Sequence, residues 1–170
     1  MIFVTVGNAT QPFLRLLKAV DGLAGQGFFQ GEEVVIQARH AGGFTPEHCR
    51  LVSVLTEGEY RTHVSEASLL ICHAGAGSLY HAFSAGKVPV AMPRRKSLGE
   101  HVEDQYAFVE ALSAEGRVVA AFEPEELPGA IRQARERMKA GAAGVSAGDR
   151  MREFVRQALE DLIGGKREAR

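Results

Sequence analysis

Short apolar runs alternate along the chain with longer stretches in which apolar residues recur at helical spacing. The apolar runs predict strands at residues 2–6, 34–38, 51–55, 69–72, 88–92 and 117–122. Helices are expected around residues 10–20, 57–66, 78–85, 102–112 and 124–138. Strands that alternate with helices are typical of α/β proteins, because each pair of parallel strands needs a crossover connection. We therefore predict a doubly wound, mostly parallel sheet.

A further amphipathic stretch at residues 149–163 follows a segment of small residues at 140–148. Its apolar stripe consists of Met151, Phe154, Val155, Ala158, Leu159, Leu162 and Ile163. The stripe predicts a last helix that packs on this domain, and a share in a partner interface is the rival interpretation. A single domain would then span residues 1–163, with a flexible tail at 164–170.

Composition removes several classes of protein. The 170 residues carry a net charge of −1, which gives no general attraction to nucleic acid or to an anionic membrane. The two cysteines, Cys49 and Cys72, do not form a disulfide scaffold, since Cys72 falls in an expected buried strand. No signal peptide and no run of transmembrane length is present. We expect a cytoplasmic protein that reaches a membrane only through another molecule.

The glycine-rich stretch His73-Ala74-Gly75-Ala76-Gly77-Ser78 lies between the fourth strand and the next helix. A strand, a tight turn and a helix start together offer free backbone amides and partial positive charge to an anion. Ser78 is suited to cap the helix or to bind a phosphate oxygen, and His73 to supply a proton or a charge. The alternative is an ordinary tight turn without a ligand.

The expected topology brings a second loop to this turn. In the common doubly wound order the first and fourth strands are neighbours, and ligands bind above the point where the chain changes direction. Gly7-Asn8 after the first strand would then meet residues 73–78, with the loop 93–104 next to them. This convergence favours a nucleotide or phosphate ligand.

Other binding motifs are missing. The dinucleotide fingerprint is absent after the first strand, and the chain contains no Walker loop and no Asp-x-Asp motif. The His and Cys residues lack the spacing of zinc ligands, and Ser78 is not in the frame of a hydrolase nucleophile. We therefore expect no metal and no cofactor.

The polar loop after the fifth strand holds further candidates. Arg94, Arg95 and Lys96 form a basic cluster that suits a phosphate or a carboxylated sugar, and the alternative is a solvated surface loop. Glu100, Asp104 and Gln105 gather acceptors and donors at a helix start, where acidic residues are also favourable without any ligand. His81, in the first turn of the glycine-loop helix, faces either the ligand or solvent.

Four segments carry a resemblance to a known family: Phe3-Val4-Thr5-Val6-Gly7, the stretch 73–78, Gly86-Lys87-x-Pro89, and the run from Pro93 through Glu100-His101 to Asp104-Gln105. Together they resemble the C-terminal domain of glycosyltransferase family 28, over roughly residues 1–120. The resemblance implies the Rossmann-like donor half of a GT-B enzyme. It is nearest to stand-alone catalytic subunits of two-component UDP-sugar transferases, including bacterial exopolysaccharide glucuronosyl and GlcNAc transferases.

The resemblance also implies site residues. Gly75, Ala76, Gly77 and Ser78 would cradle the diphosphate of a UDP-sugar. The other expected contacts are Gly7 and Asn8 on the cleft floor, Asp104 and Gln105 at sugar hydroxyls, and the segment around Leu55 at the uracil. Many relatives carry a ribose-binding Glu where this chain has His81, so ribose recognition differs at that position.

The implied activity is inverting transfer of a sugar from UDP-glucuronate or UDP-GlcNAc to a lipid-linked glycan in polysaccharide biosynthesis. Loop amides with His73 or Arg94 would stabilise the charge that develops on the departing diphosphate. A membrane-anchored subunit would bind the acceptor and hold this chain at the inner face of the membrane. Without that subunit, an exposed apolar face would favour a homo-oligomer. The alternatives are a non-catalytic UDP-sugar-binding regulatory module and a nicotinamide-binding oxidoreductase fragment.

Overall fold

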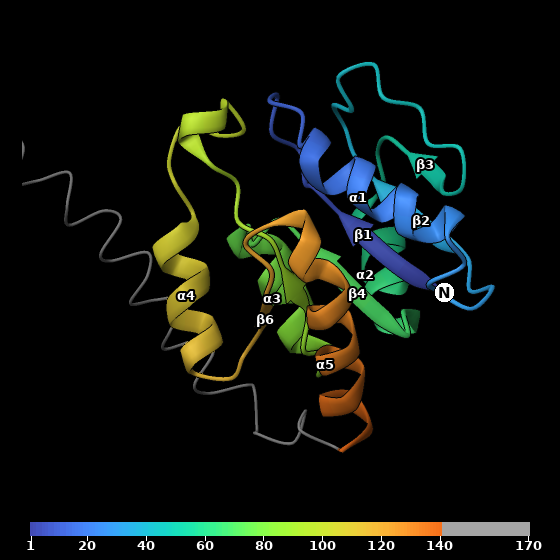
Figure 1. Ribbon diagram of the computed structural model, residues 1–170, viewed down its shortest axis with the longest axis vertical. Coiled ribbons are helices and arrows are strands. Elements are labelled where there is room, and N and C mark those ends of the chain that lie inside the picture. Colours follow the sequence, from blue (N-terminus) through green and yellow to red (C-terminus); the bar gives the residue numbers. More distant parts are fainter. Residues whose placement is uncertain (141–170) are drawn as a thin grey trace, which may run out of the picture.

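The computed structural model describes residues 1–140, whose six parallel strands form one sheet (Figure 1). The strands are β1 (Ile2–Thr5), β2 (Val34–Gln37), β3 (Arg50–Val52), β4 (Leu69–Cys72), β5 (Val90–Ala91) and β6 (Val119–Ala120). Their order is β3-β2-β1-β4-β5-β6, and every neighbouring pair is parallel. The α/β doubly wound class and the contact between the first and fourth strands are confirmed.

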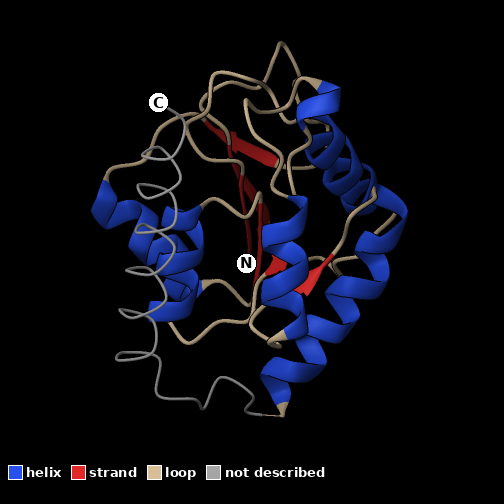
Figure 2. Cartoon of the chain, turned by 90° about the vertical axis from the view of Figure 1, so that its left-hand side faces the viewer, coloured by secondary structure: helices blue, strands red, loops and turns tan. Residues whose placement is uncertain are grey.

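Helices cover both faces of the sheet, as Figure 2 shows with the strands between two groups of helices. They are α1 (Leu14–Gly25), α2 (Glu57–Glu66), α3 (Ala76–Ser84), α4 (Tyr106–Ala114) and α5 (Leu127–Lys139), with short 3-10 helices η1 (Lys96–Leu98) and η2 (Pro124–Glu126). One core cluster joins α1 and α5 to the sheet, and the other joins α2, α3 and α4 to it. Alternate residues of each strand serve alternate clusters: Ile2 and Val4 belong to the first, and Phe3 to the second.

Strand β1 lies in the middle of the sheet because its residues are apolar on both faces. All four residues of β1 are fully buried, as are nearly all those of β2 and β4 beside it. The buried centre fixes where β1 and β4 end, and therefore where the two loops that follow them meet.

Several expected element bounds are wrong. The helix expected from residue 10 begins only at Leu14, after Phe13, and the Thr10 hydroxyl donates to Gln11 instead of capping a helix. Val102 precedes α4 and is 65% exposed, because the chain from Pro93 to Gln105 forms a loop with η1 inside it. Tyr106 opens α4 and is 40% exposed, with its ring stacked on Phe122 at 4.2 Å instead of pointing into the core. The strands after β4 are shorter than predicted.

Some expectations concern residues outside the described range. The last helix at 149–163 and the tail at 164–170 both lie there, so the proposed domain limits and the interface of that helix stay predictions. Within residues 1–140, Cys49 and Cys72 are unpaired, and no group of acidic, His and Cys side chains could hold a metal ion. None of the helices in this range has the length and hydropathy needed to cross a bilayer.

Candidate functional site

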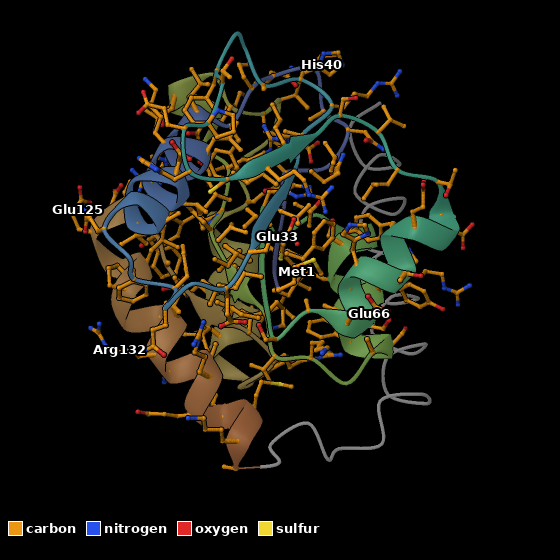
Figure 3. All side chains as sticks on the ribbon, turned by 90° about the vertical axis from the view of Figure 1, so that its right-hand side faces the viewer. Met1, Glu33, His40, Glu66, Glu125 and Arg132 are labelled. Atoms are coloured by element: carbon orange, nitrogen blue, oxygen red, sulfur yellow. The ribbon has the colours of Figure 1, made fainter. Side chains whose placement is uncertain are left out.

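A cleft of about 440 Å³ opens at the carboxyl edge of the sheet, where the loops after β1 and β4 meet. This edge is uppermost in Figure 1, and Figure 3 shows His40, on the loop after β2, at the same end. The cleft is lined by Gly7, Asn8, Gln37, Leu55, Glu57, Tyr60, His73, Gly75, Gly77, Ser78 and His81. The two loops that the sequence predicts to converge therefore do so, and Leu55 and His81 face the same space.

The glycine turn presents the start of α3 to this cleft. Gly75 is the N-cap residue, and no side chain caps the helix. The first helical hydrogen bond runs from the Leu79 amide to the Gly75 carbonyl at 3.0 Å, so the amides before Leu79 lie outside that ladder. Ser78 is buried within the first turn instead of capping it, which corrects the capping prediction, although it still lines the cleft. Such a helix end attracts an anion.

His73 forms the wall between the two loops. Its Nδ1 lies 3.3 Å from the Thr5 carbonyl oxygen. Burial, together with the nearby charge of Arg94, lowers the pKa of His73 to about 4. The imidazole is therefore neutral at pH 7 and serves as an uncharged hydrogen-bonding ring, whereas the sequence also allowed a cation.

Arg94 is a buried structural residue, which rules out a solvated side chain at this position, although residues 96–99 of the same loop are exposed. It is 1% exposed, and its guanidinium donates to the carbonyls of Val6, Gln11 and Glu100 at 2.7–2.8 Å. Burial lowers the pKa of Arg94 to about 10, so it keeps its charge at neutral pH. Nη1 and Nη2 of Arg94 hold the loop after β1, and its positive charge lies close enough to His73 to affect that ring.

Glu100 and Arg95 are also used within the protein. Glu100 is 6% exposed and accepts two hydrogen bonds at 3.1 Å from the Arg15 guanidinium, with a third at 2.9 Å from the Arg95 amide. Arg95 forms an ion pair with Glu123. Neither Glu100 nor Arg95 lines the cleft. Sequence spacing could not reveal this, because Arg15 and Glu123 come from distant segments.

The remaining predicted contacts, Ala76, Asp104 and Gln105, are not among the residues that line the cleft. The Asp104 carboxylate accepts from the Tyr106 amide at 2.9 Å and so fixes the start of α4. The Gln105 side-chain oxygen accepts from the Arg94 amide at 3.2 Å. Ala76 is exposed at the start of α3. Their roles toward a ligand stay predictions.

Three cleft residues were not predicted: Gln37, Glu57 and Tyr60. Gln37 accepts from the Thr5 hydroxyl at 2.7 Å and donates to the Ser53 carbonyl at 3.3 Å. Burial raises the pKa of Tyr60, whose ring meets that of His81 edge-on at 5.2 Å. Gln37 could have been found as the one polar side chain at the carboxyl end of an otherwise apolar strand.

The cleft combines two kinds of surface. The start of α3 offers amides and partial positive charge, which suit a phosphate group. Leu55, Tyr60 and His81 add apolar and aromatic surface to the same cleft, with the Glu57 carboxylate as a hydrogen-bond acceptor. A cleft of this size with one anion site and one ring-binding wall fits a nucleotide.

Comparison with known proteins gives one family. The sequence profile of the "Glycosyltransferase family 28 C-terminal domain" matches residues 1–160. No curated protein matches the chain significantly.

Solved structures share the fold. Spinosyn rhamnosyltransferase SpnG, complexed with thymidine diphosphate, matches 94% of this chain at 21% identity and a TM-score of 0.63. Spinosyn forosaminyltransferase SpnP matches 96% at 15% identity and a TM-score of 0.62. Glycosyltransferase SnogD from Streptomyces nogalater matches 87% at 20% identity and a TM-score of 0.57. This chain spans 44%, 43% and 39% of their respective lengths.

Proposed function

The chain belongs to the glycosyltransferase family 28 C-terminal domain family, and on this premise we propose that it is the donor-binding and catalytic subunit of a heteromeric glycosyltransferase. It takes a sugar from a UDP-sugar and acts with inversion at the anomeric carbon. The acceptor is a lipid-linked glycan in polysaccharide biosynthesis.

The uncapped start of α3 in the cleft is the observation that carries this proposal. A diphosphate needs several donors at short range, and the residues from Gly75 to Ser78 offer amides there. The thymidine diphosphate complex of SpnG supports a nucleoside diphosphate as the ligand of this fold. The base would lie against the wall of Leu55, Tyr60 and His81, where Glu57 can accept from a ribose hydroxyl.

The reaction forms one bond and breaks one. An acceptor hydroxyl oxygen attacks the anomeric carbon, the bond from that carbon to the phosphate oxygen breaks, and UDP leaves with the electron pair. The hydroxyl proton passes to a base on the acceptor-binding partner. Loop amides, the positive end of α3 and the fixed charge of buried Arg94 stabilise the growing negative charge on UDP. The Nδ1–H of neutral His73 faces the Thr5 carbonyl, so Nε2 would accept a hydrogen bond from a hydroxyl of the donor sugar-nucleotide.

A partner subunit supplies the acceptor site in this proposal. Support comes from Leu98 and Val102, which are 54% and 65% exposed on the loop after β5, at the same edge as the cleft. We propose that these two side chains contact a membrane-anchored partner, which places the chain at the inner face of the membrane.

This contact can be tested with a matched control. Leu98→Ser with Val102→Ser should abolish co-purification with the acceptor-binding subunit and leave UDP binding unchanged. Val54→Ser removes an apolar side chain of similar exposure, 63%, two residues after β3 and should leave assembly intact. Assembly that survives the double change would contradict this interface.

The donor sugar remains UDP-glucuronate or UDP-GlcNAc. The basic cluster gives no preference for glucuronate, because Arg94 is buried and Arg95 is paired with Glu123. Calorimetric titration with UDP, both UDP-sugars and NAD ranks the ligands, and we expect the UDP compounds to bind and NAD not to bind. If the chain binds NAD and none of the UDP compounds, the proposal is overturned.

Turnover separates catalysis from regulation. The chain with its acceptor-binding subunit should transfer labelled sugar from the better donor to the lipid-linked acceptor. UDP binding without transfer in any complex would instead identify a non-catalytic regulatory module.

A further inference from the structure

We propose that His73 and Ala74 are positioning residues that hold the glycine turn in its binding conformation before any ligand arrives. The inference rests on the proposed function of this cleft and explains how its amides are kept in place. Neither residue needs to touch the donor for this role.

Ala74 adopts a conformation that alanine rarely takes. Its φ is +61°, in the left-handed region where a Cβ is crowded by the backbone. The residue is 1% exposed, and its methyl group belongs to the same core cluster as Leu79 and Phe83 of α3. Burial of the methyl group therefore opposes the relaxation that the strained backbone would otherwise undergo.

His73 fixes the turn from the other side. Its Nδ1 meets the Thr5 carbonyl, and its ring lies against the backbone of both loops. A Cβ added at Gly75 would lie 2.2 Å from Nε2 of His73, and one added at Gly7 would lie 2.7 Å from Cε1. The imidazole thus occupies the space between the loops and sets their separation.

The requirement for glycine at position 75 follows from this contact. Gly75 has φ −66° and ψ 138°, a conformation open to any residue. Glycine is needed there because His73 leaves no room for a side chain. Gly7 differs, because its φ of +70° strains any other residue whatever the neighbours are.

The glycine turn therefore loses its conformational entropy when the chain folds and not when the ligand binds. A turn that is already held by a buried methyl group and a wedged ring loses little freedom when a diphosphate binds. A loosened turn must be ordered by the ligand, which weakens affinity. The strained backbone at Ala74 lowers the stability of the folded chain, and the amides of the turn are already aligned before a ligand binds.

The first test separates stability from affinity. Ala74→Gly relieves the left-handed strain and removes the anchor, so UDP should bind at least fivefold more weakly while the melting temperature changes little. Ala121→Gly removes an equally buried methyl group beyond β6, and should lower the melting temperature without changing affinity. UDP affinity in Ala74→Gly equal to that of the unmodified chain would overturn the role of Ala74.

The second test needs no ligand. Gly75→Ala should lower the melting temperature by several degrees, and adding His73→Ala should restore most of that loss. His73→Ala alone should lower the melting temperature, so its effect changes sign between the two backgrounds. Additive effects would overturn the role of His73. If the unmodified chain fails to bind UDP, only the proposed function is contradicted. The His73 and Gly75 comparison is unaffected, because it measures melting temperatures and uses no ligand.

Discussion

Two loops at the carboxyl edge of the sheet hold most of the residues that the sequence offers for binding, and the structure uses them in opposite ways. The glycine turn at residues 73–78 follows β4 and leaves amides at the start of α3 directed to the cleft. The basic loop at residues 93–105 follows β5 and engages Arg94, Arg95 and Glu100 in internal contacts. A polar or charged group beside the cleft is therefore available to a ligand only where the fold leaves it without an internal partner.

The largest effect on stability should come from Glu100 in the basic loop. Glu100→Ala removes the nearer of two carboxylates from the Arg15 guanidinium, which is 13% exposed and keeps Glu123 at 3.4 Å. We expect the free energy of unfolding in urea to fall by about 2 kcal/mol, because a largely buried charge loses its closest ionic partner. UDP affinity of the folded fraction should change less than about threefold, since Glu100 does not line the cleft.

Glu103→Ala serves as the control for Glu100, since Glu103 is an exposed acid of the same loop. Its free energy of unfolding should stay within about 0.5 kcal/mol of the unmodified value. A loss below about 1 kcal/mol for Glu100→Ala would contradict the internal role of the basic loop.

The largest effect on binding should come from Gly77 in the glycine turn. Gly77→Asp places a carboxylate in the cleft next to the bound diphosphate, and its Cβ meets nothing within 4 Å. We expect UDP affinity in calorimetry to fall by about thirtyfold, or about 2 kcal/mol, with the melting temperature unchanged. Gly129→Asp changes the net charge equally at an open helical site on α5. If both variants weaken UDP binding alike, the anion site is not at this turn.

The wedged imidazole predicts a pH dependence of stability. The unfolded chain protonates His73 as the pH falls through about 6.5, whereas the folded chain resists protonation until about 4. Its contribution to folding is therefore complete above pH 6.5 and is lost as the pH falls from 6.5 to 4, to a total of about 3 kcal/mol. His73→Gln should flatten this part of the profile measured by urea denaturation. Parallel profiles for the two proteins would contradict the assignment.

The smallest effect should come from Arg95. Its side chain is 25% exposed and its partner Glu123 is 43% exposed. Arg95→Gln should therefore cost less than about 1 kcal/mol of unfolding free energy. The affinities for UDP and UDP-glucuronate should stay unchanged in calorimetry. A loss of affinity for UDP-glucuronate alone would show that Arg95 contacts the donor sugar.

Helices and strands are predicted best where residues close together in the sequence determine them. The expected helix at 57–66 and the strand at 69–72 agree with α2 and β4. The helix α2 has a capping box between Thr56 and Glu59, which is a signal within three residues. The meeting of Gly7 with the turn at 73–78 was also predictable, because the order of parallel strands in this fold class is restricted.

The wrong or missed predictions concern side chains whose positions depend on residues far away in the sequence. The local sequence around Arg94 predicts an exposed cation. In the structure its guanidinium is buried and donates hydrogen bonds to the carbonyls of Val6 and Gln11. Gln37 and Tyr60 reach the cleft through the order of the strands and the packing of α2, which no local motif encodes. The strain at Ala74 is likewise invisible in the sequence, because alanine does not mark a left-handed position.

The measurement that tests the central claim most directly is a titration of the isotope-labelled chain with UDP, followed by amide nuclear magnetic resonance. It reads the glycine turn and the basic loop in a single experiment. We predict the largest shifts at the amides of Gly75, Ala76, Gly77 and Ser78, with small shifts at Arg94, Arg95 and Glu100. Largest shifts in the basic loop, with the glycine turn unchanged, would contradict the account.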